Sequence, residues 1–450
     1  MPTLPFSTRL TGLLPEQELA ALEKAVMSRP PKAIRLRPHA AAGAATRFEP
    51  VLPFPAEPVP WYPAGRFCLD THQPGRFLQH AAGDYFIQDA GSMLALRLLD
   101  PQPTEWIADV CAAPGGKASA ILETVGPGGG FLLANEPIHG RLPPLEYTLA
   151  RVGFPRFLIT ARDPERLEPA WAERFDAVLV DTPCTGQALV GRGQQSVFAF
   201  SEDRVAHAAA RQRRILAAAA ALVGPGGRLV YSTCTFAAAE NEHVIAAFLA
   251  EHPAWQVEPV ADLAAWQSPL APGGYRLYPH RDRCAGAYAV RLRHHGSPTP
   301  PNRVPADAAT DSFAPLTIGD DAVGSTRVGV RIKRPRRWEE WPRDIARLVD
   351  GAAAQGCEVA YQPGKHWMPA HALALRRDSD WLPATTIDLD DDSAGRYLQG
   401  LTLPAGPLGW CVATWQGNPL GWLRGNRDRC NNGLPASARL GFPPRVKEET

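Results

Sequence analysis

Residues 106 to 120 read WIADVCAAPGGKASA, and this stretch decides how the rest of the chain is interpreted. A short apolar run ends at Asp109 and Val110, a loop of small residues follows from Cys111 to Lys117, and a helical pattern continues through Val125. Strand, glycine-containing loop and helix in this order let the backbone approach a nucleotide-like ligand at the helix N-terminus. The loop has neither the spacing of a phosphate cradle nor GxGxxG, which argues against ATP and dinucleotides. A plain turn is the alternative.

A second strand pattern, Gly130 to Asn135, ends directly before Glu136, which lies 20 residues beyond Gly116. An acidic side chain in this position can accept hydrogen bonds from both hydroxyls of a ribose. The loop and the acid together favour a ligand that has a ribose and no pyrophosphate. S-adenosylmethionine fits this description, and a solvated glutamate at the start of a loop is the alternative.

Composition limits the remaining possibilities. A chain of 450 residues predicts several domains, and a net charge of +1 means that any surface for nucleic acid must be local. No apolar run approaches the roughly 18 residues of a membrane span, and Met1 to Leu14 lacks the core of a signal peptide. We therefore expect no membrane partner and a cytoplasmic protein. The eight cysteines include no CxxC pair, which predicts reduced thiols rather than a zinc ribbon or a disulfide framework.

Strand and helix patterns alternate through the centre of the chain, which predicts an α/β domain: a mostly parallel sheet with helices on both faces. Right-handed crossovers then place the carboxyl ends of the strands along one edge, where ligand-binding loops gather. The expected strands are residues 106–110, 130–135, 157–161, 175–180, 227–233 and 286–293, and the expected helices are residues 92–99, 116–125, 202–222 and 240–251. The polar or sulfur-bearing residues at or just beyond such strand ends are Cys111, Glu136, Asp163, Asp181, Cys184 and Cys234.

The N-terminal part and a linker flank this central domain, which we place at residues 71–293. Residues 1–70 combine a helical pattern at 13–27 with a short strand at 33–37 whose alternate positions are basic, so we expect a small α+β appendage. The basic strand either touches RNA or forms a solvated face of a sheet. Pro, Ser, Thr and Gly mark residues 294–325 as a linker.

The C-terminal part, residues 326–450, is expected to form one or two small, largely β modules. Arg327 to Arg337 is basic and is followed by Trp338 and Trp341. Basic residues interleaved with aromatics suit the backbone and the bases of RNA, and a solvated basic face is the alternative. Residues 410–423, WCVATWQGNPLGWL, predict a β-hairpin.

Two cysteines follow neighbouring strands of the predicted sheet. Cys184 ends the motif DTPC and Cys234 lies in STCT, so the fold should bring both thiols to one crevice. A small buried hydrophobe is the alternative for each. His207 and His243 lie on helical patterns, where we expect exposure, so they make no protease dyad, and a metal site would need more ligands. The interpretation that remains for the two cysteines is attack of a thiolate on an electrophilic carbon.

The motifs DVCAAPGGKAS, NE, ARD, DTPCTG and YSTCTF with ENE resemble, in this order, the signatures of the Nop/Sun-type RNA cytosine-5 methyltransferases. YFIQDAGSM and RLYPHRD resemble two further segments of the family, and the likeness spans about residues 80–293. The tail, best in WQGNPLGW, is similar to the C-terminal extension of bacterial RsmF-type members, which modify ribosomal RNA. The resemblance implies a Rossmann-like methyltransferase sheet with small N-terminal α+β and C-terminal, mainly β, accessory domains that bind RNA.

The resemblance also implies roles for single residues. Cys234 would add to C6 of cytosine, which makes C5 nucleophilic enough to take the methyl group of S-adenosylmethionine. Cys184 would help to release the product, and Asp181 would hydrogen-bond the base, which must leave its stack to be reached. The residues implied to hold the cofactor are Cys111, Ala112, Ala113, Pro114, Gly115, Gly116, Lys117, Glu136, Asp163 and Asp181.

The chain departs from the family pattern at Thr182 and Thr185, where the family usually has Ala and Ser. Residues 187–195 contain Arg192 as their one basic residue, where the family often has an Arg-rich stretch. These differences bear on the choice of RNA more than on the chemistry. We therefore expect a monomeric methyltransferase of small-subunit ribosomal RNA. The alternatives are a tRNA methyltransferase with the same chemistry and an RNA-binding assembly factor whose transferase site is idle.

Overall fold

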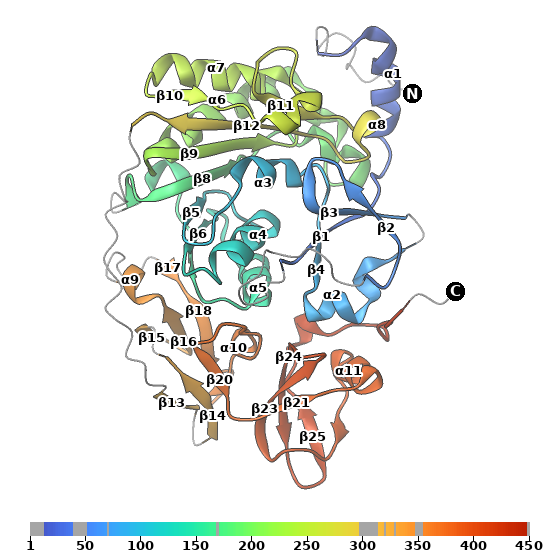
Figure 1. Ribbon diagram of the computed structural model, residues 1–450, viewed down its shortest axis with the longest axis vertical. Helices are drawn as coiled ribbons and strands as arrows, with labels where there is room; N and C mark the ends of the chain where they lie inside the picture. Colours follow the sequence, from blue (N-terminus) through green and yellow to red (C-terminus); the bar gives the residue numbers. More distant parts are fainter. Residues whose placement is uncertain are drawn as a thin grey trace.

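The computed structural model describes residues 13–38, 52–69, 72–167, 171–296, 314–318, 321–327, 330–346 and 354–447. Most of the predicted linker, and nearly all of the segment at Met1 to Leu14 tested for a signal sequence, lie outside the described residues. Figure 1 shows the main sheet in the upper half of the molecule, with the N-terminal strands beside it and the C-terminal strands below. In the part of the chain that the structure describes, no helix is both long enough and apolar enough to cross a membrane.

The main sheet confirms the predicted α/β architecture. Its strands lie in the order β10-β12-β9-β8-β5-β6-β7-β17, and β11 pairs with β12. The five central strands, β9 to β7 in that order, are parallel, whereas β10, β11, β12 and β17 are antiparallel to their neighbours. The bounds are β5 Trp106–Asp109, β6 Phe131–Asn135, β7 Phe157–Thr160, β8 Phe175–Asp181, β9 Val223–Thr233, β10 Trp255–Val257, β11 Gly274–Leu277, β12 Ala287–His294 and β17 Ala354–Gln355.

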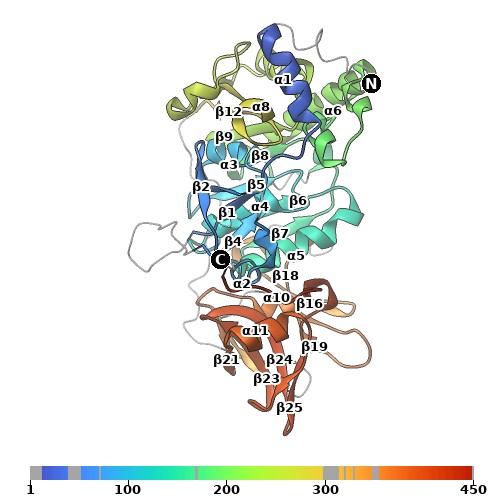
Figure 2. The same cartoon turned by 90° about the vertical axis from the view of Figure 1, so that its right-hand side faces the viewer.

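Helices cover both faces because successive residues of each buried strand point to opposite sides. Ile107 of β5 packs in the core with α3, α4 and α5, whereas its neighbours Trp106 and Ala108 pack in the core with α6 and α7. Figures 1 and 2 show these two groups of helices. Their bounds are α3 Met93–Leu99, α4 Gly116–Val125, α5 Leu142–Val152, α6 Glu202–Ala220 and α7 Glu242–Glu251.

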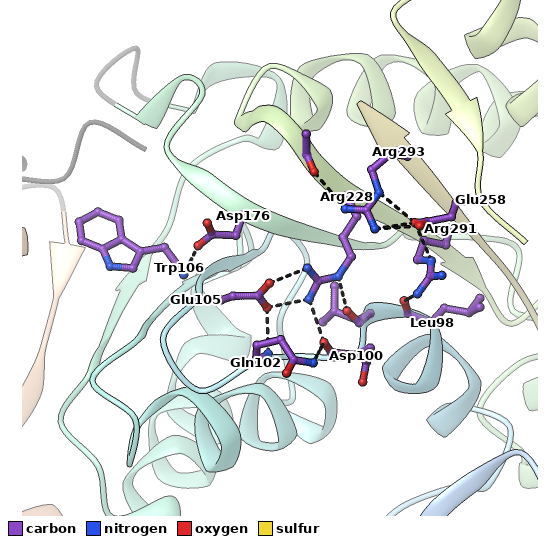
Figure 3. A network of polar contacts seen from close by, with 12 residues as sticks. Leu98, Asp100, Gln102, Glu105, Trp106, Asp176, Arg228, Glu258, Arg291 and Arg293 are labelled. Atoms are coloured by element: carbon purple, nitrogen blue, oxygen red, sulfur yellow. Dashed lines mark hydrogen bonds and ion pairs between the residues drawn. The ribbon is translucent and has the colours of Figure 1, made fainter. Parts of the chain in front are cut away.

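An arginine of β9 fixes α3 to the sheet. Arg228 donates to the carbonyl oxygens of Leu99 and Asp100, which are free acceptors at the end of α3, and it forms an ion pair of 2.6 Å with Glu105. Because Glu105 directly precedes β5, this contact locks the entry of the strand as well. Figure 3 shows the network, together with the pairing of Arg291 and Arg293 with Glu258.

The N-terminal part is α+β, as predicted. Helix α1 spans Glu16–Val26, and a sheet of order β2-β3-β1-β4 packs against α3 and α4. Strand β4 lies beyond residue 70, so this sheet draws on residues up to Ile87. The bounds are β1 Ala33–Leu36, β2 Ala56–Val59, β3 Tyr62–Cys68, α2 Leu78–Ala82 and β4 Tyr85–Ile87.

The basic strand β1 neither faces solvent nor offers a surface for RNA, so both interpretations of residues 33–37 are wrong. Arg35 is 1% exposed, donates to Gln88 at 3.0 Å and to Ser119 at 2.9 Å, and forms an ion pair with Glu123. β1 lies inside its sheet, between β3 and β4, and this face of the sheet packs on α4. The guanidinium therefore contacts side chains of α4, together with Gln88, rather than solvent.

The C-terminal part is mainly β, as predicted, and contains the hairpin β23–β24. Trp341 is fully buried and cannot stack on a base, whereas half-buried Trp338 packs against Trp367. Two strands, β13 and β14, fall within the predicted linker because Leu316 and Val323 are buried in a small core. The bounds are β13 Ala314–Ile318, β14 Asp321–Thr326, β15 Val330–Arg334, β16 Arg337–Trp341, α9 Arg343–Ala346, β18 Cys357–Tyr361, β19 Met368–Pro369, α10 His371–Ala374, β20 Trp381–Pro383, β21 Thr386–Asp388, α11 Asp391–Leu398, β22 Leu403–Pro404, β23 Gly409–Trp415, β24 Asn418–Gly425 and β25 Arg429–Asn432.

The buried pair of Arg35 and Glu123 generates a stability prediction. Arg35→Met should lower the free energy of unfolding by about 3–5 kcal/mol, because it leaves the carboxylate of Glu123 buried without its partner. The two side chains are 2% and 8% exposed, so solvent cannot replace the lost cation. The double variant Arg35→Met, Glu123→Met should recover most of this loss. Urea unfolding of the three proteins measures both effects, and equal instability of the single and double variants would contradict the account.

Candidate active site

A cavity of about 370 Å³ opens at the carboxyl edge of the parallel strands. Its size suits a cofactor-sized molecule. The loop after β5, the end of β8 and the end of β9 all contribute to its wall, as the strand order predicts. The residues singled out from the sequence that line it are Cys111, Ala112, Ala113, Pro114, Gly116, Lys117, Asp181 and Cys234.

The glycine loop lies close against α5 and is fixed to the next strand. Gly115 has a φ of +108°, a backbone conformation that residues with a Cβ rarely adopt. A Cβ built on it would also lie only 2.9 Å from the Cβ of Thr148, so both the backbone and the space exclude a larger residue. The amide of Ala112 donates to the carbonyl of Asn135 at 2.8 Å. The side-chain amide of Asn135 in turn donates to the carbonyl of Val110 at 3.0 Å. The loop therefore presents its backbone to the cavity in a fixed conformation.

Glu136 offers an acceptor that fits a ribose. It is 1% exposed, one carboxylate oxygen accepts from the amide of Ile138 at 2.9 Å, and the other lies 3.2 Å from the guanidinium of Arg141. That second oxygen, Oε2, accepts no hydrogen bond within the described residues. A buried carboxylate oxygen that accepts no hydrogen bond, although a guanidinium lies near it, fits a ligand that supplies hydroxyl groups. Glu136 and Gly115 are not among the described residues that line the cavity itself.

Asp163 is not among the described residues that line the cavity. It is exposed at the end of β7, and its carboxylate accepts from the amide of Glu165, which caps a short 3₁₀ turn, η3, at Pro164–Arg166. Its role toward a cofactor stays a prediction.

Charges at the base of the cavity are coupled. Asp181 forms an ion pair of 2.6 Å with Lys117 and accepts a hydrogen bond of 2.7 Å from Ser232. Burial disfavours the charged form of Lys117, but the pairing with Asp181 outweighs it and raises the pKa of the ammonium group. Sequence reasoning missed Asp109, which also lines the cavity and is 1% exposed. Burial and then the charge of Asp181 raise the pKa of Asp109 to about 7, so it is partly protonated at neutral pH.

The two cysteines lie side by side, with 3.3 Å between their sulfur atoms. The pairing of β8 with β9 brings the two loops together: its last pair is Asp181 with Ser232, and Cys184 and Cys234 follow this pair by three and two residues. Both cysteines are half-buried residues, and Cys234 packs at the edge of an apolar cluster. The hydrogen bond with Cys234, together with burial, raises the pKa of Cys184 well above its usual value. Cys234 lines the cavity.

A buried glutamate that sequence reasoning missed holds the two cysteine loops together. Glu240 is 0% exposed and accepts from the amide and the hydroxyl of Thr185, at 2.9 and 2.6 Å. It also accepts from Thr235 at 3.1 Å and from Gln212 of α6 at 2.9 Å. Thr185 follows Cys184 and Thr235 follows Cys234, so one carboxylate spans both loops. The motif ENE was the available signal, and the hydroxyl of Thr185 explains why a polar residue stands there.

Sequence reasoning also missed the ion pair at the wall of the cavity. Asp89 pairs with Arg192 and accepts from the amide of Ala285 at 3.2 Å, so three distant segments meet at this point. His207 and His243 are exposed, as predicted. Within the described residues, no cluster of three or more His, Cys, Asp or Glu side chains could hold a metal ion.

Known proteins resemble this chain along most of its length. The family model described as 16S rRNA methyltransferase RsmB/F matches residues 96–293. The model of the N-terminal domain of 16S rRNA methyltransferase RsmF matches residues 3–90, and the model of the methyltransferase RsmF PUA domain matches residues 384–440. Two relatives named ribosomal RNA small subunit methyltransferase F, from Cronobacter sakazakii and Klebsiella pneumoniae, are 32% and 30% identical, and each alignment covers 84% of this chain and 83% of the relative.

Solved structures share the fold of the central domain. A crystal structure of NSun6 from Pyrococcus horikoshii with SFG is 17% identical, with a TM-score of 0.56 over 66% of this chain and 99% of that one. A methyltransferase homologue from the same organism is 24% identical, with a TM-score of 0.53 over 64% of this chain and 93% of that one.

The sheet, its glycine loop and the cavity define a Rossmann-like methyltransferase that depends on S-adenosylmethionine. The similarity along the chain then settles the group: the protein belongs to the RsmB/F family of 16S rRNA methyltransferases, in the RsmF-like form with an N-terminal domain and an RNA-binding PUA domain. Its reaction is methylation of cytosine C5 in 16S rRNA.

The bridge made by Glu240 generates a prediction that separates position from chemistry. Glu240→Ala should cost about 3 kcal/mol of stability, because it leaves buried donors unpaired, and should lower kcat much more than the affinity for S-adenosylmethionine. Glu240→Gln, which keeps the shape and one acceptor oxygen, should be milder in both respects. Exposed Glu251 on α7 is the control, and Glu251→Ala should change neither quantity. Urea unfolding and methyl transfer to 16S rRNA are the measurements, and wild-type turnover of Glu240→Ala would refute the positioning role.

Proposed function

We propose that Cys234 is the nucleophile of this methyltransferase and that its thiolate adds to C6 of the target cytosine. Addition at C6 places electron density on C5, which then takes the methyl group, and it splits one difficult step into two easier ones. The observation that carries the proposal is the position of Cys234 on the cavity wall, 3.3 Å from Cys184 and directly after β9, the strand that pairs with Asp181.

Cys184 serves in the second half of the reaction in this proposal. After methyl transfer, C5 must lose its proton so that the bond between C6 and Cys234 can break and the thiolate can leave. A general base takes this proton, the electron pair of the C5–H bond forms the C5–C6 double bond, and Cys234 leaves as a thiolate. Cys184, whose sulfur lies 3.3 Å from that of Cys234, takes part in this release. Asp181 hydrogen-bonds the cytosine ring, and Lys117 orients Asp181 through their ion pair.

The residues that would hold the cofactor are inferred from how the site fits S-adenosylmethionine. When bound, S-adenosylmethionine supplies an electrophilic methyl group. The loop from Cys111 to Lys117 would hold it along the cavity, and Glu136 would bind the ribose hydroxyls with Oε2, which accepts no hydrogen bond among the described residues. Asp163 would contact the cofactor from the end of β7, and Asp181 would lie where the cofactor and the base meet.

The division of labour along the chain is also part of the proposal. Residues 71–293 form the catalytic domain, residues 1–70 and 326–450 position the RNA, and residues 294–325 connect them. The PUA domain within the C-terminal part supports this division. We propose that the protein acts as a monomer in the cytoplasm, where ribosomal RNA is its substrate.

Replacing the two cysteines tests the proposed roles. Cys234→Ala should abolish methyl transfer, because it removes the sulfur that adds to C6. Cys184→Ala should accumulate a covalent protein–RNA adduct, because release is impaired while addition is intact. Bisulfite sequencing of 16S rRNA from cells with and without each variant reads the first effect, and denaturing gels of protein with RNA read the second. Calorimetric binding of S-adenosylmethionine shows that each variant is folded.

Retained methylation by Cys234→Ala would overturn its role as the nucleophile. A Cys184→Ala variant that turns over normally and shows no adduct would overturn the release role. Wild-type protein that binds no S-adenosylmethionine would instead favour an idle assembly factor.

A further inference from the structure

An exposed aromatic ring stands beside the active site and is not explained by the reaction itself. Phe198 is 70% exposed, and the preceding Val197 is 40% exposed. Among the Phe, Tyr and Trp residues that the structure describes, Phe198 alone falls in the exposed class. A phenylalanine gains from burial, so a ring held in water in this way calls for a partner.

The ring is presented by a fixed turn rather than by a loose loop. Phe198 belongs to the 3₁₀ turn η6, Val197–Phe200, and the next residues, Ala199 and Phe200, are 0% and 3% exposed. The amide of Ala199 donates to Ser196 at 2.9 Å, and the carbonyl of Phe198 accepts from the amide of the residue at 201, at 3.0 Å, where α6 begins. Buried anchors thus follow the exposed ring directly.

The same turn is tied to both cysteine loops. The side chain of Gln187 donates to the carbonyl of Ala199 at 3.3 Å and accepts from the amide of Phe236 at 3.0 Å. Gln187 lies three residues after Cys184, and Phe236 lies two residues after Cys234. The side chain of Phe200 packs in the apolar cluster against which Cys234 is partly buried. Phe198 therefore precedes Ala199, whose carbonyl contacts the loop that follows Cys184. It is two residues from Phe200, which packs in the cluster beside Cys234.

The segment between the cysteine loop and the turn forms part of the cavity wall. Leu189 and Arg192, in the 3₁₀ turn η5 at Gln187–Arg192, line the cavity, and η6 packs against η5. All residues from Gly193 to Phe198 are exposed, so the chain runs outward from the cavity wall to the ring. The exposed ring consequently belongs to a turn that packs directly against the wall of the cavity.

We propose that Phe198 is a stacking residue for the RNA base beside the target cytosine. The inference rests on the proposed chemistry, in which the target base leaves its stack to reach Cys234. Extrusion of one base leaves its neighbour with an uncovered face, and an exposed aromatic ring restores the stack that was lost. Stacking of this kind tolerates any base, so Phe198 contributes binding and register rather than sequence readout.

The test compares Phe198→Ala, Phe198→Trp and the control Leu270→Ala, which removes a 46% exposed apolar side chain outside the cavity wall. The substrates are 16S rRNA and small ribosomal subunits from cells that lack the enzyme. Phe198→Ala should raise KM for RNA about tenfold, the size expected when one base–aromatic stack is lost. Its affinity for S-adenosylmethionine should stay within twofold of wild type, and Phe198→Trp should restore KM.

Salt dependence separates stacking from charge. Loss of a stack weakens RNA binding equally at all salt concentrations, whereas loss of a phosphate contact changes the slope of log Kd against log salt. Phe198→Ala should therefore keep the slope of wild type.

A KM of Phe198→Ala within twofold of wild type, an equal rise in Leu270→Ala, or failure of tryptophan to restore KM would each overturn the inference while the wild-type protein still methylates. Wild-type protein without activity would overturn the proposed function, and this inference with it.

Discussion

The structure depends on the parallel pairing of β8 with β9. This pairing sets Asp181 beside Ser232, and the loops that follow hold the sulfur atoms of Cys184 and Cys234 3.3 Å apart. Two loops that leave a sheet would normally diverge, because no strand hydrogen bonds hold them. Glu240 prevents this by accepting hydrogen bonds from both loops at once. The reactive pair is thus a product of strand register and one buried carboxylate.

The accessory parts stiffen this centre instead of standing apart from it. Arg35 anchors the N-terminal sheet to α4, the helix that begins in the cofactor loop. Helix α1 packs with the apolar cluster around Cys234, and Gly191 of η5 lies close against the end of α1, where a Cβ would come within 2.2 Å of the carbonyl oxygen of Ser28. Strand β17, from the C-terminal part, extends the main sheet beside β7. Regions expected to bind RNA therefore also help to fix the geometry of the catalytic loops.

The sequence predicted the central sheet and the position of the cysteines because both follow from periodicity and strand order. The sequence did not predict that Arg35 is buried. A basic residue in an amphipathic strand gives the same pattern whether it contacts solvent or a buried glutamate. Asp109 and Glu240 were missed for a related reason, since their importance comes from contacts between segments far apart in the chain. β13 and β14 were missed because polar, proline-rich composition outweighed the few apolar residues that they bury.

The most direct test of the account is to trap the covalent step and read which sulfur carries the RNA. Substrate RNA with 5-fluorocytidine at the modified position accepts addition at C6 and the methyl group, but the C5 fluorine cannot leave as a proton does, so release is blocked. Mass spectrometry of the digested complex should find the nucleotide on the peptide that contains Cys234. A nucleotide on Cys184, or active protein that forms no adduct, would contradict the central claim.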